Sequence, residues 1–283
     1  PAGYFHVYVE MAKQDVDVVI HLGDYIYEYG ADGYATEDAV ALGRTLAEDN
    51  NTEIVKLDDY RKRYALYRGD EDMQAVHARH PFIVVWDDHE LTNDTWREGA
   101  ENHQENEGDF FERKLAALQA YFEWMPIRPI SEDDHLNIYR QFNFGELVQL
   151  NMLDTRILAR DAQLDYTNYI TASGVDFVKF QADLTAQDRT LLGHTQRGWL
   201  QQQLATSKAT WNVLGQQVLM AKMLIPAELL MSLAQITSGN VTEETLTAMN
   251  TQITELVTIK MRIAQGDPNV TEQEKARVNT VAP

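Results

Sequence analysis

The most distinctive chemical pattern in this chain is a row of polar side chains that directly follows an apolar stretch. Residues 81–86 read Pro-Phe-Ile-Val-Val-Trp. The potential metal ligands and proton carriers that follow are Asp87, Asp88, His89, Glu90, Asn93 and Asp94. The same pattern occurs earlier, where apolar residues 18–20 lead through His21-Leu22-Gly23 to Asp24, with Tyr27 three residues further on. Oxygen-rich clusters with an occasional histidine or tyrosine suit hard cations, and two of them at neighbouring strand ends suit a two-metal hydrolytic centre.

Each of these patterns also has a structural explanation. Asp24 can cap the next element, with the tyrosines around it as half-buried aromatic side chains. Asp87 and Asp88 can begin a helix beside a neutral histidine. In the functional interpretation, one or both of these aspartates and the Asn93 amide bind metal, while His89 donates a hydrogen bond to a phosphate or a leaving group.

A third strand that ends in polar residues is followed by a positively charged side chain, that of Arg156. Residues 147–153 are followed by Asp154-Thr155-Arg156. Arg156 is either one half of an ordinary ion pair or a bidentate clamp on a phosphoryl group, because a chain with a formal charge of −20 needs a fixed cation to hold an anion. The ion pair is the safer interpretation from the sequence alone.

The composition narrows the class of protein. With 283 residues, 44% of them hydrophobic, the chain can bury a sizeable core. The charge of −20 argues against a nucleic-acid partner, since phosphate backbones demand a basic face. The chain has no cysteine, no apolar run that could span a membrane and no glycine-rich nucleotide motif. It begins without methionine, so we expect it to start inside a longer protein.

The elements that must position these residues follow from hydrophobic periodicity, which predicts an α/β fold. Helices are expected over 4–14, 57–79 with a break at Gly69-Asp70, 109–124, 196–206 and 242–265, the last with Thr242 as N-cap. Strands are expected over 18–22, 82–86, 138–144, 147–153 and 211–214. Four of these strands end in polar residues. Polar residues at neighbouring strand ends can meet at one edge of a sheet and form a site there.

Taken together, these residues resemble a known family, the PhoD-type alkaline phosphatases, within the calcineurin-like and purple-acid-type metallophosphoesterases. The runs that carry the resemblance occur in the family's order, within roughly residues 3–223, and are 21–28, 60–67, 76–90, 153–156 and 211–216. The resemblance implies a four-layer α/β/β/α sandwich, incomplete in this chain. It also implies hydrolysis of phosphomonoesters or phosphodiesters by a metal-activated hydroxide, a centre of Fe3+ with Ca2+, and export from the cell interior.

The resemblance also implies roles for individual residues. Asp24 corresponds to a bridging carboxylate and Tyr27 to a phenolate ligand of iron. Asp88 and Asn93 correspond to ligands of the other metal, and Asp87 is close enough in sequence to exchange roles with Asp88. His89 and Arg156 are the candidates that assist the attack on phosphorus.

Some parts of the family pattern are absent. The family has a cysteine ligand just before residue 1, and later aspartate and histidine ligands that this chain lacks. We therefore expect residues 1–283 to be the N-terminal and central part of one metallophosphoesterase domain, with a helical insertion near 227–270. Because metal ligands are missing, we expect the isolated chain to be inactive.

Other functions stay open at this stage. Within the phosphoester hydrolases, a phospholipase D-like enzyme or a nucleotide phosphodiesterase is the alternative, and substrate choice is expected to depend on loops such as 31–53. A different class, a non-catalytic surface protein that binds Ca2+ on the same fold, also fits the acidic loops. The expected partner is a phosphoester substrate, and the sequence does not indicate an oligomeric state.

Overall fold

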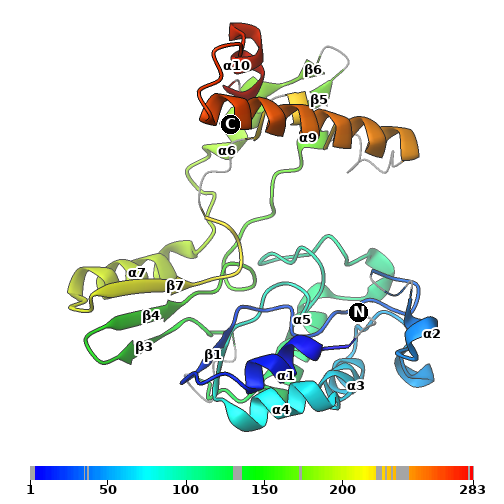
Figure 1. The fold of residues 1–283 in the computed structure, drawn as a ribbon. Coiled ribbons are helices and arrows are strands. Elements are labelled where there is room, and N and C mark those ends of the chain that lie inside the picture. The colour runs from blue at the N-terminus through cyan, green and yellow to red at the C-terminus, as the bar shows by residue number, and fades with distance from the viewer. Residues whose placement is uncertain are drawn as a thin grey trace. The chain divides into compact units, whose positions relative to one another are not determined.

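The computed structural model describes residues 4–34, 36, 38–129, 136–171, 174–220, 225, 226, 228–230, 232, 233, 242–279, 281 and 282. The chain forms two compact units, drawn in Figure 1. The first unit comprises residues 1–163 and 188–219, and the second unit comprises residues 164–187 and 220–283. Both contain helices and strands, so the mixed α/β class predicted from the sequence is confirmed.

The first unit holds every candidate site residue. Its helices are α1 (His6–Ala12), α2 (Ala39–Leu42), α3 (Leu57–Arg68), α4 (Glu71–Arg79), α5 (Phe110–Trp124) and α7 (Gly193–Thr206), with 3-10 turns at Glu48–Asn50 and Glu105–Glu107. Its strands are β1 (Val19–His21), β2 (Phe82–Val84), β3 (Arg140–Phe144), β4 (Val148–Met152) and β7 (Trp211–Gly215). The elements predicted from the sequence for this unit are thus all present, with shifts of a few residues at their ends.

The pairing of β1 with β2 decides where the first two polar rows lie. The two strands are parallel, with Val19 opposite Phe82 and His21 opposite Val84. One further backbone hydrogen bond, from Val85 N to His21 O at 3.1 Å, continues the pairing beyond the strands. Because the carboxyl ends of parallel strands meet at the same edge, Asp24 and Asp87 emerge side by side.

A second sheet positions the third and fourth strand ends. β3 and β4 form an antiparallel hairpin, and β4 pairs in parallel with β7 (Figure 1). Past the strands, Leu153 N donates to Gly215 O at 2.8 Å. Gln217 then ties the two ends together, because its Oε1 accepts from Thr155 N at 3.1 Å and its Nε2 donates to Leu153 O at 2.9 Å. Arg156 therefore leaves the sheet from a firmly held backbone.

An aromatic core joins the helices of the first unit to β2 and β4. Trp86, Tyr60, Tyr64 and Tyr121 are buried in one apolar cluster that also contains Leu150. Helix α3 packs against α5, and α1 packs against α4. Burying this much aromatic surface is the main favourable term for folding, and it fixes the strands that carry the site.

The predicted break between α3 and α4 has a clear local cause. The Asp70 carboxylate accepts hydrogen bonds from the backbone N–H groups of Asp72 and Met73, at 3.0 and 3.1 Å. This is the N-cap arrangement that satisfies the otherwise unpaired amides of a helix start. Asp70 also pairs with Arg44 at 2.8 Å, so the cap is held from a second segment.

The second unit contains the helical segment expected near the end of the chain. Helix α9 (Glu243–Ala264) is capped by Thr242, which accepts from Thr245 N at 3.1 Å as predicted. It packs with α10 (Glu272–Asn279) around a small core of Leu256, Ile259, Val270 and Val278. The other elements are a 3-10 turn at Tyr166–Tyr169, β5 (Ile170–Thr171), β6 (Gly174–Val175), α6 (Phe177–Leu184), β8 (Ile225–Pro226) and β9 (Val281–Ala282).

Three predictions about architecture remain predictions. Residues 227, 231 and 234–241 of the expected insertion lie outside the described residues. The units and sheets described above do not decide between these predictions and their alternatives. The predictions are the single-domain organisation of residues 1–283, the insertion over 227–270 and the four-layer sandwich.

Among the described residues, none of the helices combines the length and apolar character that crossing a membrane requires.

Candidate metal centre

The site begins at a close approach between two backbones. Gly23 has a φ of 111°, and a Cβ atom at this position would lie 2.2 Å from Asp87 N and 2.4 Å from Asp87 Cβ. Only glycine lets the loop after β1 come this near to the loop after β2. The next residue, Asp24, also has a positive φ of 58°, an unusual conformation that directs its side chain toward the second loop.

Three potential ligands converge at this point. A carboxylate oxygen of Asp24, one of Asp88 and a ring nitrogen of His89 all lie within 4.8 Å of one another. The Asp24 Oδ2 atom accepts a hydrogen bond from the Tyr27 hydroxyl at 3.2 Å. Its Oδ1 atom is buried and has no hydrogen-bond partner. The structure therefore brings together four of the residues singled out from the sequence, namely Asp24, Tyr27, Asp88 and His89.

The electrostatics of Asp24 favour a nearby cation. Burial raises the pKa of its carboxyl group, and Asp88 raises it further, although His89 and Arg156 pull it down. Burial, together with the neighbouring Asp24 carboxylate, also raises the pKa of the Tyr27 phenol. A buried oxygen without a partner, next to a second carboxylate, is costly unless a positive charge is present. The carboxylates of Asp24 and Asp88 and the Tyr27 hydroxyl form an oxygen-rich donor set, which fits a hard metal ion.

His89 is held in place by a buried carboxylate. Its Nδ1 atom bonds to Glu28 Oε2 at 2.7 Å, and the Glu28 side chain is completely buried. Burial alone would lower the pKa of His89, but the hydrogen bond and charge of Glu28 outweigh it and raise the pKa to about 9. Its ring also stacks on Tyr27, with centroids 4.3 Å apart. With Nδ1 engaged, Nε2 is the atom that can contact a ligand.

Glu28 also organises the loop that follows β2. Its Oε1 atom accepts hydrogen bonds from Asn93 N at 2.8 Å and from Asn102 Nδ2 at 2.9 Å. The side-chain amide of Asn93 instead donates to Glu101 Oε2 at 3.0 Å. The backbone of Asn93 is thus close to the centre, whereas its proposed role as a metal ligand remains a prediction.

Arg156 lies within a group of aspartates. Its Nε donates to Asp87 Oδ1 at 2.6 Å and its Nη1 donates to Asp94 Oδ1 at 3.1 Å. Its Nη2 lies 3.4 Å from Asp88 Oδ2, and its side chain is only 12% exposed. Burial and the charge of Asp88 nevertheless raise the pKa of Asp87 to about 6. The ion-pair interpretation of Arg156 describes this geometry, although the pair is buried rather than on the surface.

We expect Arg156→Lys to lower the free energy of unfolding by about 1–2 kcal/mol, because an ammonium group cannot contact three carboxylates at once as the guanidinium does. Urea denaturation of the metal-free chain would measure it. The matched control is Arg61→Lys, which changes an ion pair with Glu123 on the surface. There the loss should be much smaller, because solvent screens an ion pair on the surface. Equal losses at the two positions would contradict the role of Arg156 as a buried link.

The buried side chain of Glu90 connects the loop after β1 to the loop after β2. Its Oε1 accepts from Tyr25 N and its Oε2 accepts from Asp87 N, the latter at 2.8 Å. The side chain is fully buried, and burial raises its pKa to about 8. A single carboxylate therefore fixes the backbone beside Asp24 and the backbone of Asp87.

The sequence assigned no individual role to Glu28, and it grouped Glu90 and Asp94 with the potential ligands without indicating what either side chain contacts. Each lies within or beside a polar row, so the only signal was a carboxylate in a stretch that the neighbouring strands bury. Their partners are distant in sequence, 61 residues in the case of Glu28 and His89, and no spacing rule connects them. They position the cluster rather than form it.

We expect Glu28→Gln to lower the pKa of His89 from about 9, because the charge of Glu28 is removed while the burial that lowers the pKa stays. An NMR titration of the imidazole C–H resonances in the metal-free chain would measure this. The other histidines in the same spectra provide the internal reference. An unchanged His89 titration would show that Glu28 does not set the charge of this ring.

Comparison with known proteins places the chain in a family. A sequence model of the PhoD-like phosphatases matches residues 1–260. The chain belongs to the PhoD-like phosphatase family. The resemblance inferred from the sequence motifs is therefore confirmed.

Two PhoD-like relatives show how much of the chain is shared. Alkaline phosphatase D of Bacillus subtilis (strain 168) is 41% identical over 223 residues, which is 78% of this chain and 36% of that protein. A solved structure, described as the structure of PhoD, has a TM-score of 0.64 and 38% identity, covering 78% of this chain and 40% of that chain. The chain thus spans two fifths or less of the length of these relatives.

Proposed function

We propose that the protein containing this chain is a metal-dependent phosphoester hydrolase of the alkaline phosphatase D type. The observation that carries the proposal is the convergence of Asp24, Asp88 and His89 within 4.8 Å, at the edge of a parallel strand pair in a PhoD-like chain. The partnerless buried Oδ1 atom of Asp24 supports it, since a cation is the simplest group that would satisfy this oxygen.

We propose Fe3+ and Ca2+ as the metals, in line with the hard, oxygen-rich donor set. Asp24 would serve both ions and Tyr27 would bind iron, while Asp88, together with Asp87 and Asn93, would serve the second ion. When bound, the ions supply Lewis acidity that activates water and neutralises the charge developing on phosphorus. A cation of this strength would also offset the high pKa that Tyr27 has without metal.

The remaining chemistry belongs to the residues of this chain. His89, kept protonated by Glu28, is placed to donate a hydrogen bond or a proton from Nε2 to a phosphate or leaving-group oxygen. Arg156 holds Asp87 and Asp94, which keeps the loop after β2 in the conformation that carries Asp88. The substrate is thus a phosphoester, and the negative charge of the chain disfavours nucleic acid. We further propose that the protein is exported, as expected for this family.

The direct test is hydrolysis of a chromogenic phosphomonoester and the matching diester, with Fe3+ and Ca2+ supplied. Both the 283-residue chain and the longest natural polypeptide that contains it should be assayed. Turnover by the longer polypeptide supports the proposal, and the ratio of monoester to diester rates distinguishes a phosphomonoesterase from a phosphodiesterase. A folded, metal-loaded polypeptide that turns over neither ester would instead favour a non-catalytic Ca2+-binding protein.

A further inference from the structure

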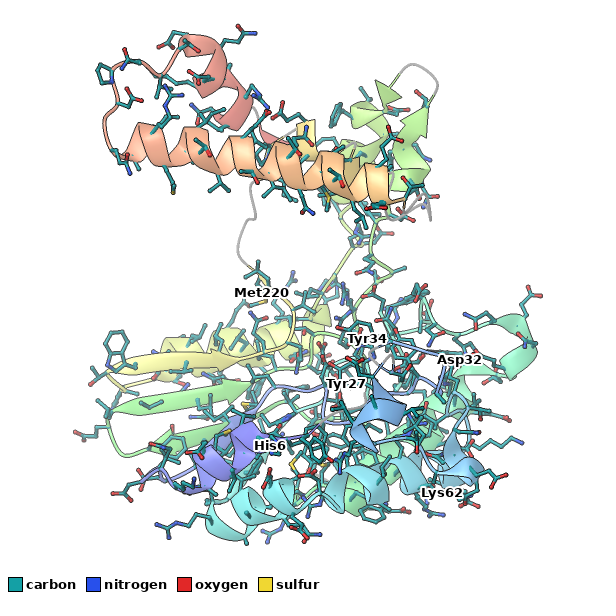
Figure 2. All side chains as sticks on the ribbon, turned by 45° about the vertical axis from the view of Figure 1, so that its right-hand side comes forward. His6, Tyr27, Asp32, Tyr34, Lys62 and Met220 are labelled. Carbon is teal, nitrogen blue, oxygen red and sulfur yellow. The ribbon has the colours of Figure 1, made fainter. Side chains whose placement is uncertain are left out.

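A row of aromatic rings leads from His89 toward solvent. Tyr27 stacks on His89 with centroids 4.3 Å and planes 29° apart. Tyr34 follows, with its centroid 6.2 Å from that of Tyr27 and the planes 28° apart. Figure 2 labels both tyrosines in the first unit. Because Tyr27 also contacts the Asp24 carboxylate, this row begins at the candidate metal centre itself.

A second tyrosine supports the outer ring of this row. Tyr29 lies 6.1 Å from Tyr34 and 5.6 Å from His89, measured between ring centroids. Yet the Tyr34 residue remains 64% exposed. Its ring is therefore packed on two aromatic neighbours while most of its surface faces solvent.

The backbone around this row is anchored from the protein interior. The buried guanidinium of Arg63 donates to Tyr27 O at 2.5 Å and to Tyr29 O at 2.8 Å. Ala31 N donates to Asn51 O at 2.8 Å, and Gly33 N donates to Gly30 O at 3.1 Å. The segment that leads to Tyr34 is thus held as far as Gly33, which limits the conformational entropy lost if a ligand stacks on the ring.

An exposed tyrosine alone carries no meaning, since single exposed aromatic side chains are common on protein surfaces. The difference here is position, because this ring continues a stack that starts at the centre where phosphoester hydrolysis is proposed. The charge of −20 adds a second reason, since a substrate that relied on many phosphate contacts would be repelled. A neutral aromatic group gains affinity by stacking instead.

We propose that Tyr34 is a stacking platform for a planar aromatic group in the organic part of the phosphoester, such as a nucleobase or an aryl alcohol. This inference rests on the proposed function. Aromatic rings favour offset stacking at centroid distances of about 4.5–7 Å, and every nucleobase offers such a face. The row would then place the aromatic group on Tyr34 while the phosphate lies at the metal that Asp24 and Asp88 would hold, beside His89.

The test compares three phosphomonoesters, adenosine 5′-monophosphate, phenyl phosphate and glycerol 3-phosphate, on the longest natural polypeptide loaded with metal. For Tyr34→Ala, we expect the kcat/KM ratio of each aromatic ester to glycerol 3-phosphate to fall about tenfold, which corresponds to about 1.4 kcal/mol. The effect should appear mainly in KM. Tyr34→Phe keeps the ring and should keep the ratio.

Phe111→Ala is the matched control, because this ring is 54% exposed on α5 and belongs to no part of the site. It should leave all three ratios unchanged. A fall for both aromatic esters supports a general aromatic platform, and a fall for the adenosine ester alone supports a nucleobase platform. An unchanged ratio for Tyr34→Ala, with the unsubstituted enzyme active, overturns the platform. Absence of turnover of all three esters by the unsubstituted enzyme would overturn the proposed function instead.

Discussion

Asp24→Asn is expected to abolish phosphoester hydrolysis by the longest natural polypeptide, with a loss in kcat of at least about a thousandfold. Changes in residues that only support metal ligands already cost about 10–100-fold, and Asp24 is the proposed ligand of both ions. An asparagine keeps the size of the side chain but removes the charge and one acceptor oxygen. Assays of both ester types, together with elemental analysis of Fe and Ca, would measure the loss and its cause.

Although Asp24→Asn should abolish activity, it should stabilise the metal-free chain. Because burial and Asp88 raise the pKa of Asp24, the folded state disfavours the ionised form, and a neutral side chain should increase the free energy of unfolding. Metal should raise the Tm of the unsubstituted protein and fail to raise that of Asp24→Asn. Loss of activity with full metal content and unchanged metal stabilisation would contradict Asp24 as a ligand.

Asp32→Asn provides the matched control for both experiments. Asp32 is an exposed aspartate eight residues further along the chain, and it lies outside the ligand cluster. The same chemical change there should alter neither turnover nor metal content. Surface substitutions of this kind usually change stability by no more than about 0.5 kcal/mol.

One geometric rule explains why the sequence could predict that the candidate ligands lie close together. Polar residues that directly follow apolar strands must gather wherever those strands pair in parallel, and β1 and β2 do so with His21 opposite Val84. Asp24 and Asp88 are therefore near each other for a reason that is already present in the order of residue types. The register itself needed the structure, since a one-residue slip would turn each side chain to the other face.

The contacts that hold the cluster could not be predicted in this way. Glu90 reaches back to Tyr25, 65 residues earlier, and Glu28 reaches forward to His89. A buried carboxylate can be satisfied by any nearby N–H group, so neither residue type nor spacing specifies its partner. Arg156 shows the same limit, because the sequence could not distinguish a phosphate clamp from the three carboxylates that it contacts.

Two helices of the second unit were not predicted, for different reasons. Helix α6 did carry a signal, since Asp176 accepts from Lys179 N at 3.0 Å as a capping residue would, and Phe177, Phe180 and Leu184 follow at helical spacing. Helix α10 offered almost none, because Val278 is its single buried side chain and its other residues are largely charged or polar. Such a helix depends on packing against α9 rather than on its own pattern.

Gly23→Ala is expected to destabilise the chain by roughly 4 kcal/mol or more, which is exceptional for the addition of one methyl group. The new Cβ would lie 2.2 Å from Asp87 N, a backbone atom that cannot rotate away. The steric clash can be relieved only if the loops after β1 and β2 separate. That movement would break the hydrogen bonds of Glu90 to both loops and part Asp24 from Asp88. Urea denaturation of the metal-free chain measures the cost.

Gly43→Ala separates the steric clash from backbone strain, because Gly43 has a φ of 65° but a Cβ atom added there would meet no other atom within 4 Å. A positive φ alone should cost about 1 kcal/mol there. The larger loss at Gly23 would then measure the closeness of the two loops. If the two glycines gave equal losses, the loops would be able to part without penalty. The proximity of Asp24 to Asp88 would then depend on bound metal rather than on the fold.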